Sequence, residues 1–288
     1  MEGTGLNAEG KGPAVLTVDG ERVEATGCRV EVQSPLWRSG ASLFETMLVR
    51  REGETGLAFL DDHIARLVRS AGHLGLSGLP GAERLKAWVR EAAHRFKESS
   101  SGPGRLRLTV AWTRSGAPPV AAVLVVPYGA SPGQASAWVT PVRLAWGLSF
   151  PMPKWGNRLL YDLAEREARR SGADEGLLVD ARGAALEGAR SNLFLVREDA
   201  LVTPPLESGA LPGIARGKVI ELAKEAGLAV REEAIDISRL QPGDELFLTN
   251  ALWGVRPVAA LNGRSRPVGP VSLLLKERYE QLLNSSLE

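Results

Sequence analysis

The sequence predicts an α+β protein built from two domains. Strand-like and helix-like segments alternate along both halves of the chain, a pattern typical of α+β and α/β folds. The 288 residues also exceed the roughly 100–200 residues of one ordinary domain. Residues 129–137 combine small residues, Pro and Gly without periodicity, so we expect the linker there, with domains at 13–130 and 131–288.

The first domain is predicted to combine paired strands with two helices. Residues 14–25 are expected to form a hairpin with an Asp-Gly turn. Asp61 or Asp62 is expected to cap the first helix, and Gly75 to end it. Further strands are predicted at 43–50, 56–60, 105–114 and 120–128, and the second helix at 81–98.

The second domain is predicted to continue this alternation. One helix is expected to begin near Ile214, after a Pro-Gly pair, and to end at Gly227. Strands are predicted at 138–144, 176–180, 191–196, 229–235 and 245–250, and another helix at 157–171.

The composition is that of an ordinary packed protein and argues against several classes of function. The 35 Lys and Arg residues balance 34 Asp and Glu residues, and no segment gathers like charges as a nucleic-acid-binding tail does. No apolar run approaches the ~18–20 residues of a membrane span, and residues 1–12 lack the pattern of a signal peptide. We therefore expect a cytoplasmic protein without nucleic-acid or membrane partners.

Motifs for metals and nucleotides are also missing from the sequence. Cys28 is the single cysteine, so neither a disulfide framework nor a cysteine metal site can form. His63, His73 and His94 do not have the spacing of facing metal ligands. No Gly-rich phosphate loop of the usual kinds is present. We therefore predict no metal site.

Lys154 stands in unusual surroundings for a lysine. It lies in PMPKWGN, between two prolines, a methionine and a tryptophan, just before a predicted helix. An amine in apolar surroundings has a lowered pKa and can attack carbonyl groups. The alternative is a loop lysine whose stem packs beside Trp155 while its amine stays in water.

Two further features of the second half could bind a ligand. The first amides of the helix in LPGIAR belong to Ile214 and Ala215, and a helix N-terminus attracts phosphate. Glu187 follows a strand and a turn, where its carboxylate could face a site at a strand end. Taken singly, each has an ordinary explanation, since most helix ends bind water and most turn glutamates are solvated.

The order of these features resembles the class IV aminotransferase family of pyridoxal-phosphate enzymes. The resemblance covers roughly residues 40–260, with its most specific motifs after residue 150. The matching text is LFET (43–46), HIARL (63–67), KWGNRLL (154–160), GADEGLLVD (172–180), ALEGARSNLFLV (185–196), TPPL (203–206), LPGIAR (211–216) and DELFLTNAL (244–252). The resemblance implies a fold-type IV enzyme, with a smaller N-terminal domain, a larger C-terminal domain and the cofactor, pyridoxal 5'-phosphate, between them.

The resemblance also assigns roles to individual residues. It implies that Lys154 is the Schiff-base lysine and proton shuttle, and that Glu187 faces the pyridine nitrogen and keeps it protonated. Arg66 would hold the phosphate, although without the resemblance a surface charge on a helix is the simpler interpretation. The other implied cofactor-binding residues are Arg158, at the phenolic oxygen, and Ile214, Ala215, Asn250 and Ala251.

Two departures from the family's usual text affect these roles. Many members carry Thr where Ala215 stands, so this helix start offers an amide but no hydroxyl. Residues 34–42, SPLWRSGAS, replace the Asp-Arg and Gly-Asp-Gly text that usually precedes FET. Contacts from that loop are therefore not carried over.

Within the family, Arg158 and the NAL of residues 250–252 look most like 4-amino-4-deoxychorismate lyases, which release 4-aminobenzoate and pyruvate. The rival hypothesis is a branched-chain or D-amino-acid transaminase on the same site, and a third is a non-catalytic relative. A substrate with amine and carboxylate groups would find candidate partners in Arg107 and Arg114 of the predicted strand 105–114. The family resemblance also implies a homodimer.

Overall fold

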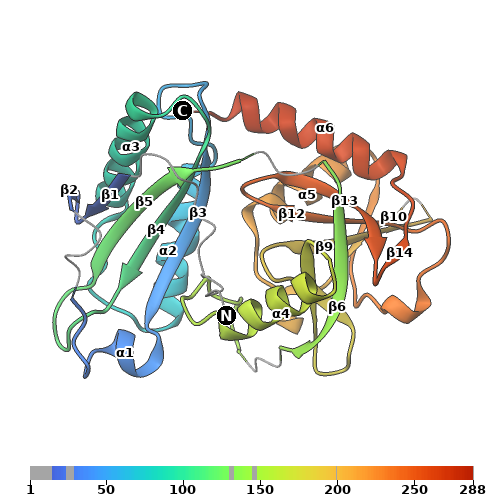
Figure 1. Ribbon diagram of the computed structural model, residues 1–288, viewed down its shortest axis with the longest axis horizontal. Coiled ribbons are helices and arrows are strands. Elements are labelled where there is room, and N and C mark those ends of the chain that lie inside the picture. Colours follow the sequence, from blue (N-terminus) through green and yellow to red (C-terminus); the bar gives the residue numbers. More distant parts are fainter. Residues whose placement is uncertain (1–14, 24–28, 130–132, 145–147, 199, 288) are drawn as a thin grey trace. The chain divides into compact units, whose positions relative to one another are not determined.

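The computed structural model describes residues 15–23, 29–129, 133–144, 148–198 and 200–287 (Figure 1). The chain divides into two compact units. Unit 1 runs to residue 130 and also contains Trp155–Asn157 and the residues from Ser286 onward, while unit 2 contains Ser131–Lys154 and Arg158–Ser285. The predicted boundary between residues 130 and 131 lies outside the described residues.

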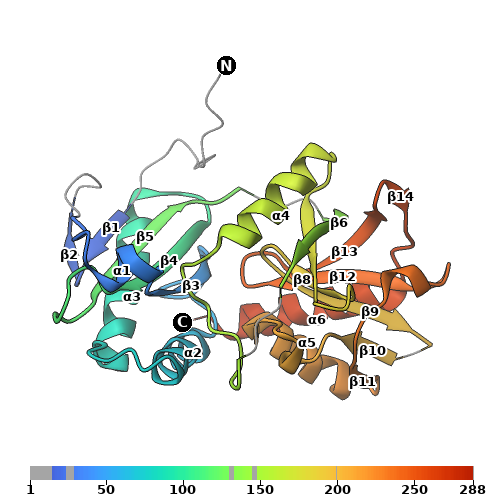
Figure 2. The ribbon, with the colours of Figure 1, turned by 90° about the horizontal axis from the view of Figure 1, so that it is seen from below.

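Unit 1 is an antiparallel sheet with helices packed on one face. The strand order is β2-β1-β5-β4-β3, and the predicted hairpin with its Asp-Gly turn is present as β1 and β2. The elements are β1 (Val15–Val18), β2 (Glu21–Arg22), α1 (Pro35–Ser39), β3 (Ser42–Val49), α2 (Leu60–His73), α3 (Ala82–Ser99), β4 (Gly104–Ala111) and β5 (Val120–Pro127). Figure 2 shows α2 and α3 on the same side of this sheet.

The strand period of two decides which residues of β3 meet the helices. Leu43 and Met47 point to the helical side, where they join a core with Ile64 and Leu67 of α2. Glu45 lies between them on the same side and is fully buried. A carboxylate on the apolar side of a strand requires charged partners, which α2 supplies, as described below.

Several local expectations for unit 1 were wrong. Asp61 and Asp62 lie in the first turn of α2 rather than at its cap, which is Phe59 in a left-handed conformation. The predicted strand 56–60 contributes only isolated bridges at Leu57 and Ala58. Residues 34–42, predicted to be a loop, contain α1, which Ser34 caps through its side chain.

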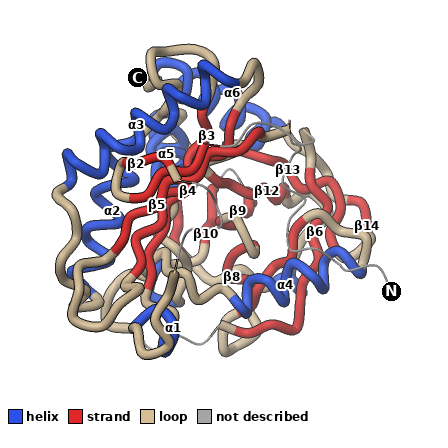
Figure 3. Tube along the Cα trace, turned by 60° about the vertical axis from the view of Figure 1, so that its left-hand side comes forward, coloured by secondary structure: helices blue, strands red, loops and turns tan. Residues whose placement is uncertain are grey.

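Unit 2 contains a nine-stranded mixed sheet. Its strand order is β11-β10-β9-β12-β13-β6-β7-β8, with β14 paired to β13. β8 also pairs with β9, so the strands from β9 round to β8 close on themselves (Figure 3). The strands are β6 (Ala135–Arg143), β7 (Glu175–Val179), β8 (Ala185–Gly188), β9 (Asn192–Arg197), β10 (Ala200–Thr203), β11 (Ala229–Glu232), β12 (Glu245–Asn250), β13 (Gly254–Leu261) and β14 (Arg264–Ser265).

The helices of unit 2 include two that the sequence predicted. These are α4 (Leu159–Arg170) and α5 (Ile214–Glu225), whereas α6 (Pro270–Ser285) was missed. Two short 3-10 turns lie at Leu206–Ser208 and Ile237–Arg239. The strand β13 was also missed, because Pro257 within GVRPVAAL argues against a strand. β6 begins at Ala135, so the predicted linker 129–137 overlaps a strand.

The mixed arrangement of helices and strands in both units confirms the predicted fold class. No helix among the described residues is long and apolar enough to cross a membrane. The same residues contain no cluster of three or more His, Cys, Asp or Glu side chains arranged to hold a metal ion.

Candidate functional site

Glu187 is a buried carboxylate held by three donors of unit 2. It lies on β8, opposite Asn192 of β9, and its side chain is almost entirely enclosed. Its Oε2 accepts hydrogen bonds from the Leu211 amide at 2.9 Å and from Asn192 Nδ2 at 3.4 Å. Its Oε1 accepts a hydrogen bond from the Tyr161 hydroxyl at 3.1 Å. Glu187 is therefore not a solvated turn residue, because three hydrogen bonds hold its carboxylate where β8 pairs with β9.

The surroundings of Glu187 bring the pKa of its carboxyl group close to neutral pH. Burial raises the pKa of its carboxyl group to about 7, against the lowering effects of the Leu211 amide, the Tyr161 hydroxyl and the positive charges of Lys154 and Arg158. These charges act on Glu187 because Lys154 and Arg158 lie near it. Lys154 therefore lies close enough to Glu187 for its charge to act on the carboxylate, and their shared role at a cofactor stays a prediction.

Lys154 follows two buried residues. Met152 and Pro153 are both enclosed, while Lys154 itself is half-buried. Lys154 therefore lies at the end of an apolar segment of the loop, and its charge acts on Glu187. This setting agrees with the apolar environment that PMPKWGN indicates.

The helix start predicted at Ile214 lies beside this carboxylate. Gly213 is the N-cap of α5, and the first i to i−4 bond runs from the Gly217 amide to the Gly213 carbonyl. The earlier helical amides, including those of Ile214 and Ala215, have no such partner within the helix and face its positive end. A β-carbon on Gly213 would lie 2.0 Å from Asn192 Oδ1, so the close approach requires glycine.

Asn192 connects the helix start to Glu187. Its Nδ2 donates to the Leu211 carbonyl at 2.8 Å as well as to Glu187. One side chain therefore holds both the buried acid and the segment that leads into the N-terminus of α5.

A buried hydroxyl without a partner lies in the same row of the sheet. Thr249 of β12 is opposite Asn192, which is opposite Glu187. Thr249 Oγ1 is enclosed and makes no hydrogen bond to the described part of the chain. A buried hydroxyl without a partner and a helix N-terminus can donate to a phosphate, and a buried carboxylate can accept from a protonated ring nitrogen, so these residues fit pyridoxal phosphate.

The next two residues after Thr249 are the predicted cofactor residues Asn250 and Ala251. Asn250 Oδ1 accepts hydrogen bonds from the amides of Leu252 and Trp253, at 2.9 and 3.0 Å. The Asn250 side chain therefore shapes this turn, and its Nδ2 also donates to the Arg190 carbonyl at 3.2 Å. Ala251 lies half-buried within the turn.

Arg158 lies beside the acid, in contact with groups of the protein. Its Nη2 donates to the Ala189 carbonyl at 2.7 Å, and its guanidinium lies 4.8 Å from the centre of the Tyr161 ring. The proposed contact of Arg158 with the cofactor's phenolic oxygen stays a prediction.

Arg66 of unit 1 belongs to a buried ionic cluster that the sequence did not reveal. Its Nε and Nη2 donate to the two carboxylate oxygens of Glu45, at 2.8 and 2.5 Å. His63 Nδ1 lies 2.7 Å from Glu45 Oε2. All three side chains are buried, so Arg66 is not the surface charge that was the alternative interpretation. Glu45 lies in LFET and Arg66 in HIARL, but no local pattern in either motif pairs the two residues.

Glu45 is ionised at neutral pH. Burial alone would raise the pKa of the Glu45 carboxyl group, but the charge of Arg66 and the hydrogen bonds of His63 and Arg66 lower it to about 2. A carboxylate this strongly held fixes the guanidinium plane of Arg66, whose predicted role is to bind phosphate.

We expect Glu45→Ala to destabilise the protein by about 3–5 kcal/mol, because Arg66 would remain buried without its carboxylate. Denaturant unfolding at pH 7 measures the change. Since the folded-state pKa of Glu45 lies below its ordinary 4.5, its stabilising effect is present above that pH and is lost as the pH falls toward 2. The exposed pair of Asp61 with Lys86 provides a control, and Asp61→Ala should leave stability nearly unchanged. Equal effects of the two substitutions would contradict the ionised cluster.

The two predicted substrate arginines differ in their settings. Arg107 of β4 lies 3.9 Å over the Phe44 ring and donates through Nε to Thr109 Oγ1 at 3.3 Å. Arg114 is exposed in the bend after β4, which ends at Ala111, so its placement on the strand was wrong. The structure does not bring these two arginines together on one strand face.

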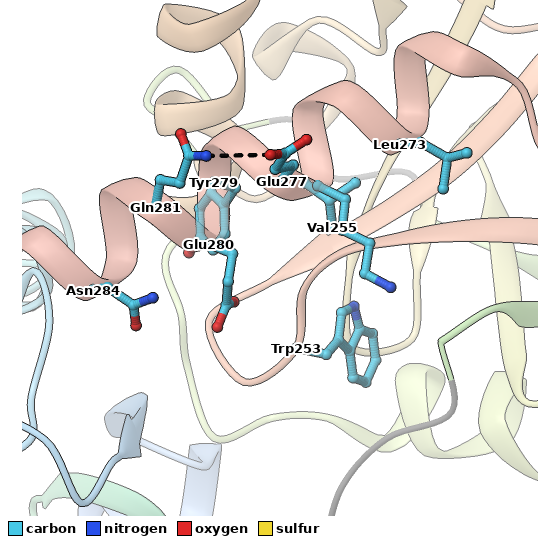
Figure 4. Close-up of a pocket in the computed structure, with 9 residues that line it drawn as sticks. Trp253, Val255, Leu273, Glu277, Tyr279, Glu280, Gln281 and Asn284 are labelled. Atoms are coloured by element: carbon cyan, nitrogen blue, oxygen red, sulfur yellow. Dashed lines mark hydrogen bonds between the residues drawn. The ribbon is translucent and has the colours of Figure 1, made fainter.

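A separate cavity of unit 2 contains none of the predicted residues. It has a volume of about 350 Å³ and lies between α6 and the turn after β12. Figure 4 shows Trp253 and Tyr279 among the side chains around it. Its charged lining residues are Lys276, Glu277 and Glu280, and neither Lys154 nor Glu187 is among the residues that line it.

The chain is similar to several known aminotransferases. The family described as amino-transferase class IV matches residues 42–261. The branched-chain-amino-acid aminotransferase of Escherichia coli is 38% identical over 136 residues, which is 46% of this chain and 44% of that relative. The alignment thus spans less than half the length of this curated relative. The D-alanine aminotransferase of Bacillus licheniformis is 27% identical over 286 residues, covering 93% of this chain and 96% of that protein.

A solved structure extends the similarity to the fold. A hypothetical aminotransferase from Mycobacterium tuberculosis, in a form described as PLP-bound, superposes with a TM-score of 0.79 at 25% identity. The match covers 96% of this chain and 99% of that one. Because the family match extends over most of the chain and the fold agrees, the protein belongs to the class IV aminotransferase family.

Proposed function

We propose that the protein is a pyridoxal-phosphate-dependent aminotransferase that acts on a small amino acid. The observation that carries this proposal is the buried Glu187, with a pKa near 7, beside the charge of Lys154 and the start of α5. The aminotransferase relatives support transfer of an amino group over the lyase reaction. A homodimer and a substrate with amine and carboxylate groups are part of the same proposal.

The residues divide the work between binding and proton transfer. The amides of Ile214 and Ala215 and the Thr249 hydroxyl would bind the phosphate, and the role of Arg66 in binding it stays a prediction. Glu187 would hold a proton on the pyridine nitrogen, and Lys154 would carry the cofactor and then move the proton at the substrate's reacting carbon. When bound, pyridoxal phosphate supplies the electron sink for the carbanion formed there.

The reaction removes the amino group of an amino acid, which becomes a 2-oxo acid. The amino group is then transferred to a second 2-oxo acid. Adding an amino acid alone should therefore convert the bound cofactor to its pyridoxamine form, which absorbance follows. Branched-chain L-amino acids and D-alanine are the first substrates to test, with a 2-oxo acid added afterwards to restore the original spectrum. Failure of every amino acid to change the spectrum of the loaded enzyme would contradict transamination.

A second candidate function is 4-amino-4-deoxychorismate lyase activity. It is favoured by Arg158, which lies against Tyr161 near Glu187, and by the Asn250-Ala251-Leu252 turn, the two features that look most like that enzyme. Incubation with aminodeoxychorismate separates the candidates, because the lyase alone forms pyruvate and 4-aminobenzoate in equal amounts. Pyruvate release without any response to amino acids would replace the first proposal with the second.

A further inference from the structure

The two oxygens of Glu187 are not equivalent. Oε2 accepts two hydrogen bonds, from the Leu211 amide and Asn192, while Oε1 accepts one, from Tyr161. A carboxylate oxygen has about two acceptor positions. Among the hydrogen bonds of the described residues, Oε2 is therefore filled, and Oε1 keeps one position beside the Tyr161 hydroxyl.

We propose that Tyr161 is a positioning residue that orients Glu187, so that Oε1 is the oxygen presented to the cofactor's ring nitrogen. This inference rests on the proposed function, because it assumes that a pyridine ring faces Glu187. Tyr161 acts through Glu187 and does not itself touch the cofactor.

Packing fixes the direction of the Tyr161 hydroxyl. Tyr161 lies in the first turn of α4, and its ring is buried among apolar side chains that include Ala164, Leu178 and Leu186. The Arg158 guanidinium lies over this ring and is anchored to the Ala189 carbonyl, directly after β8. A ring enclosed on these sides places its hydroxyl on Oε1 without an entropic cost at the moment of binding.

Tyrosine suits this role because it remains a donor. Burial and the negative charge of Glu187 raise the pKa of the Tyr161 hydroxyl, although the charge of Arg158 lowers it. The hydroxyl therefore stays protonated across the working range of pH. A hydrogen bond from this group favours the ionised form of Glu187 over the neutral form.

The test compares Tyr161→Phe with the unaltered protein, loaded and free of cofactor. Loss of a hydrogen bond to a charged group should lower kcat about tenfold or more, with little change in KM. In the cofactor-free protein, the pH at which stability falls as Glu187 ionises should move upward by about one pH unit, as thermal unfolding between pH 4 and 9 measures. Among the described residues, the other groups that act on Glu187 are Lys154, Arg158, Asn192 and the Leu211 amide, and all of them are unchanged in this variant.

A matched control removes another buried tyrosine hydroxyl of the same unit. Tyr279 lies on α6, and Tyr279→Phe should leave both the pH midpoint and kcat unchanged. A general packing role for Tyr161 would lower the unfolding temperature without moving the pH midpoint, and that outcome overturns the proposal.

Failure of the proposed function can be told apart from failure of this inference. If borohydride reduction of the loaded, unaltered protein leaves no phosphopyridoxyl group on Lys154, the function is wrong. If Lys154 is labelled but Tyr161→Phe matches the unaltered protein in kcat and pH midpoint, only the role of Tyr161 is wrong.

Discussion

Lys154→Ala should lower the rate of amino-group transfer by at least about 10³-fold. The substitution removes the amine that would hold the cofactor and also the group that would move the substrate proton, and proton transfer alone contributes about 10²–10⁴-fold. The variant loaded with cofactor should also lack the visible absorbance that arises when the cofactor is attached to a lysine. Steady-state rates and the absorbance spectrum of the purified variant measure the two effects.

Two variants separate the amine of Lys154 from its charge. Lys154→Arg keeps a positive charge beside Glu187 but removes the attacking amine, so it should be as inactive as Lys154→Ala. Lys224→Ala removes an exposed lysine of α5 and should retain full activity. After borohydride reduction of the unaltered enzyme, a labelled peptide that contains any lysine other than Lys154 would refute the assignment.

The candidate site residues that could be predicted from the sequence are those that their immediate sequence neighbours make recognisable. Lys154 was visible from its apolar neighbours, and the start of α5 from a Pro-Gly pair before a periodic segment. Glu187 was found as a carboxylate, but its burial was not expected, because β8 has four residues and reads as a turn. Such a short strand becomes recognisable only through its pairing with β7 and β9.

The partners of these groups could not be predicted, because they depend on contacts between distant segments. Tyr161 is separated from Glu187 by 26 positions, and in a helical pattern it is read as an ordinary core residue. Glu45 and Arg66, 21 positions apart, meet only because α2 packs on the face of β3 that carries Glu45. The sequence therefore predicts reactive groups more readily than the residues that hold them.

Glu187→Gln should lower kcat about 10²–10³-fold while leaving the cofactor attached to Lys154. An amide cannot supply the negative charge that keeps the pyridine nitrogen protonated, and removal of one well-placed electrostatic partner has an effect of this size. Retained absorbance of the loaded variant would distinguish this loss from loss of binding. Glu207→Gln, at an exposed position of the 3-10 turn, should be fully active.

The same variant should change how stability depends on pH. Because the folded-state pKa of Glu187 is about 7, against an ordinary value of 4.5, the folded cofactor-free protein binds a proton more tightly than the unfolded chain does. Its free energy of unfolding should therefore fall by about 3 kcal/mol as the pH rises from 4.5 to beyond 7. Glu187→Gln has no proton to lose, so this decline should vanish and the variant should be the more stable protein at pH 8. Parallel stability curves for the two proteins would show that Glu187 ionises as freely as an exposed glutamate, which would contradict the raised pKa that its burial implies.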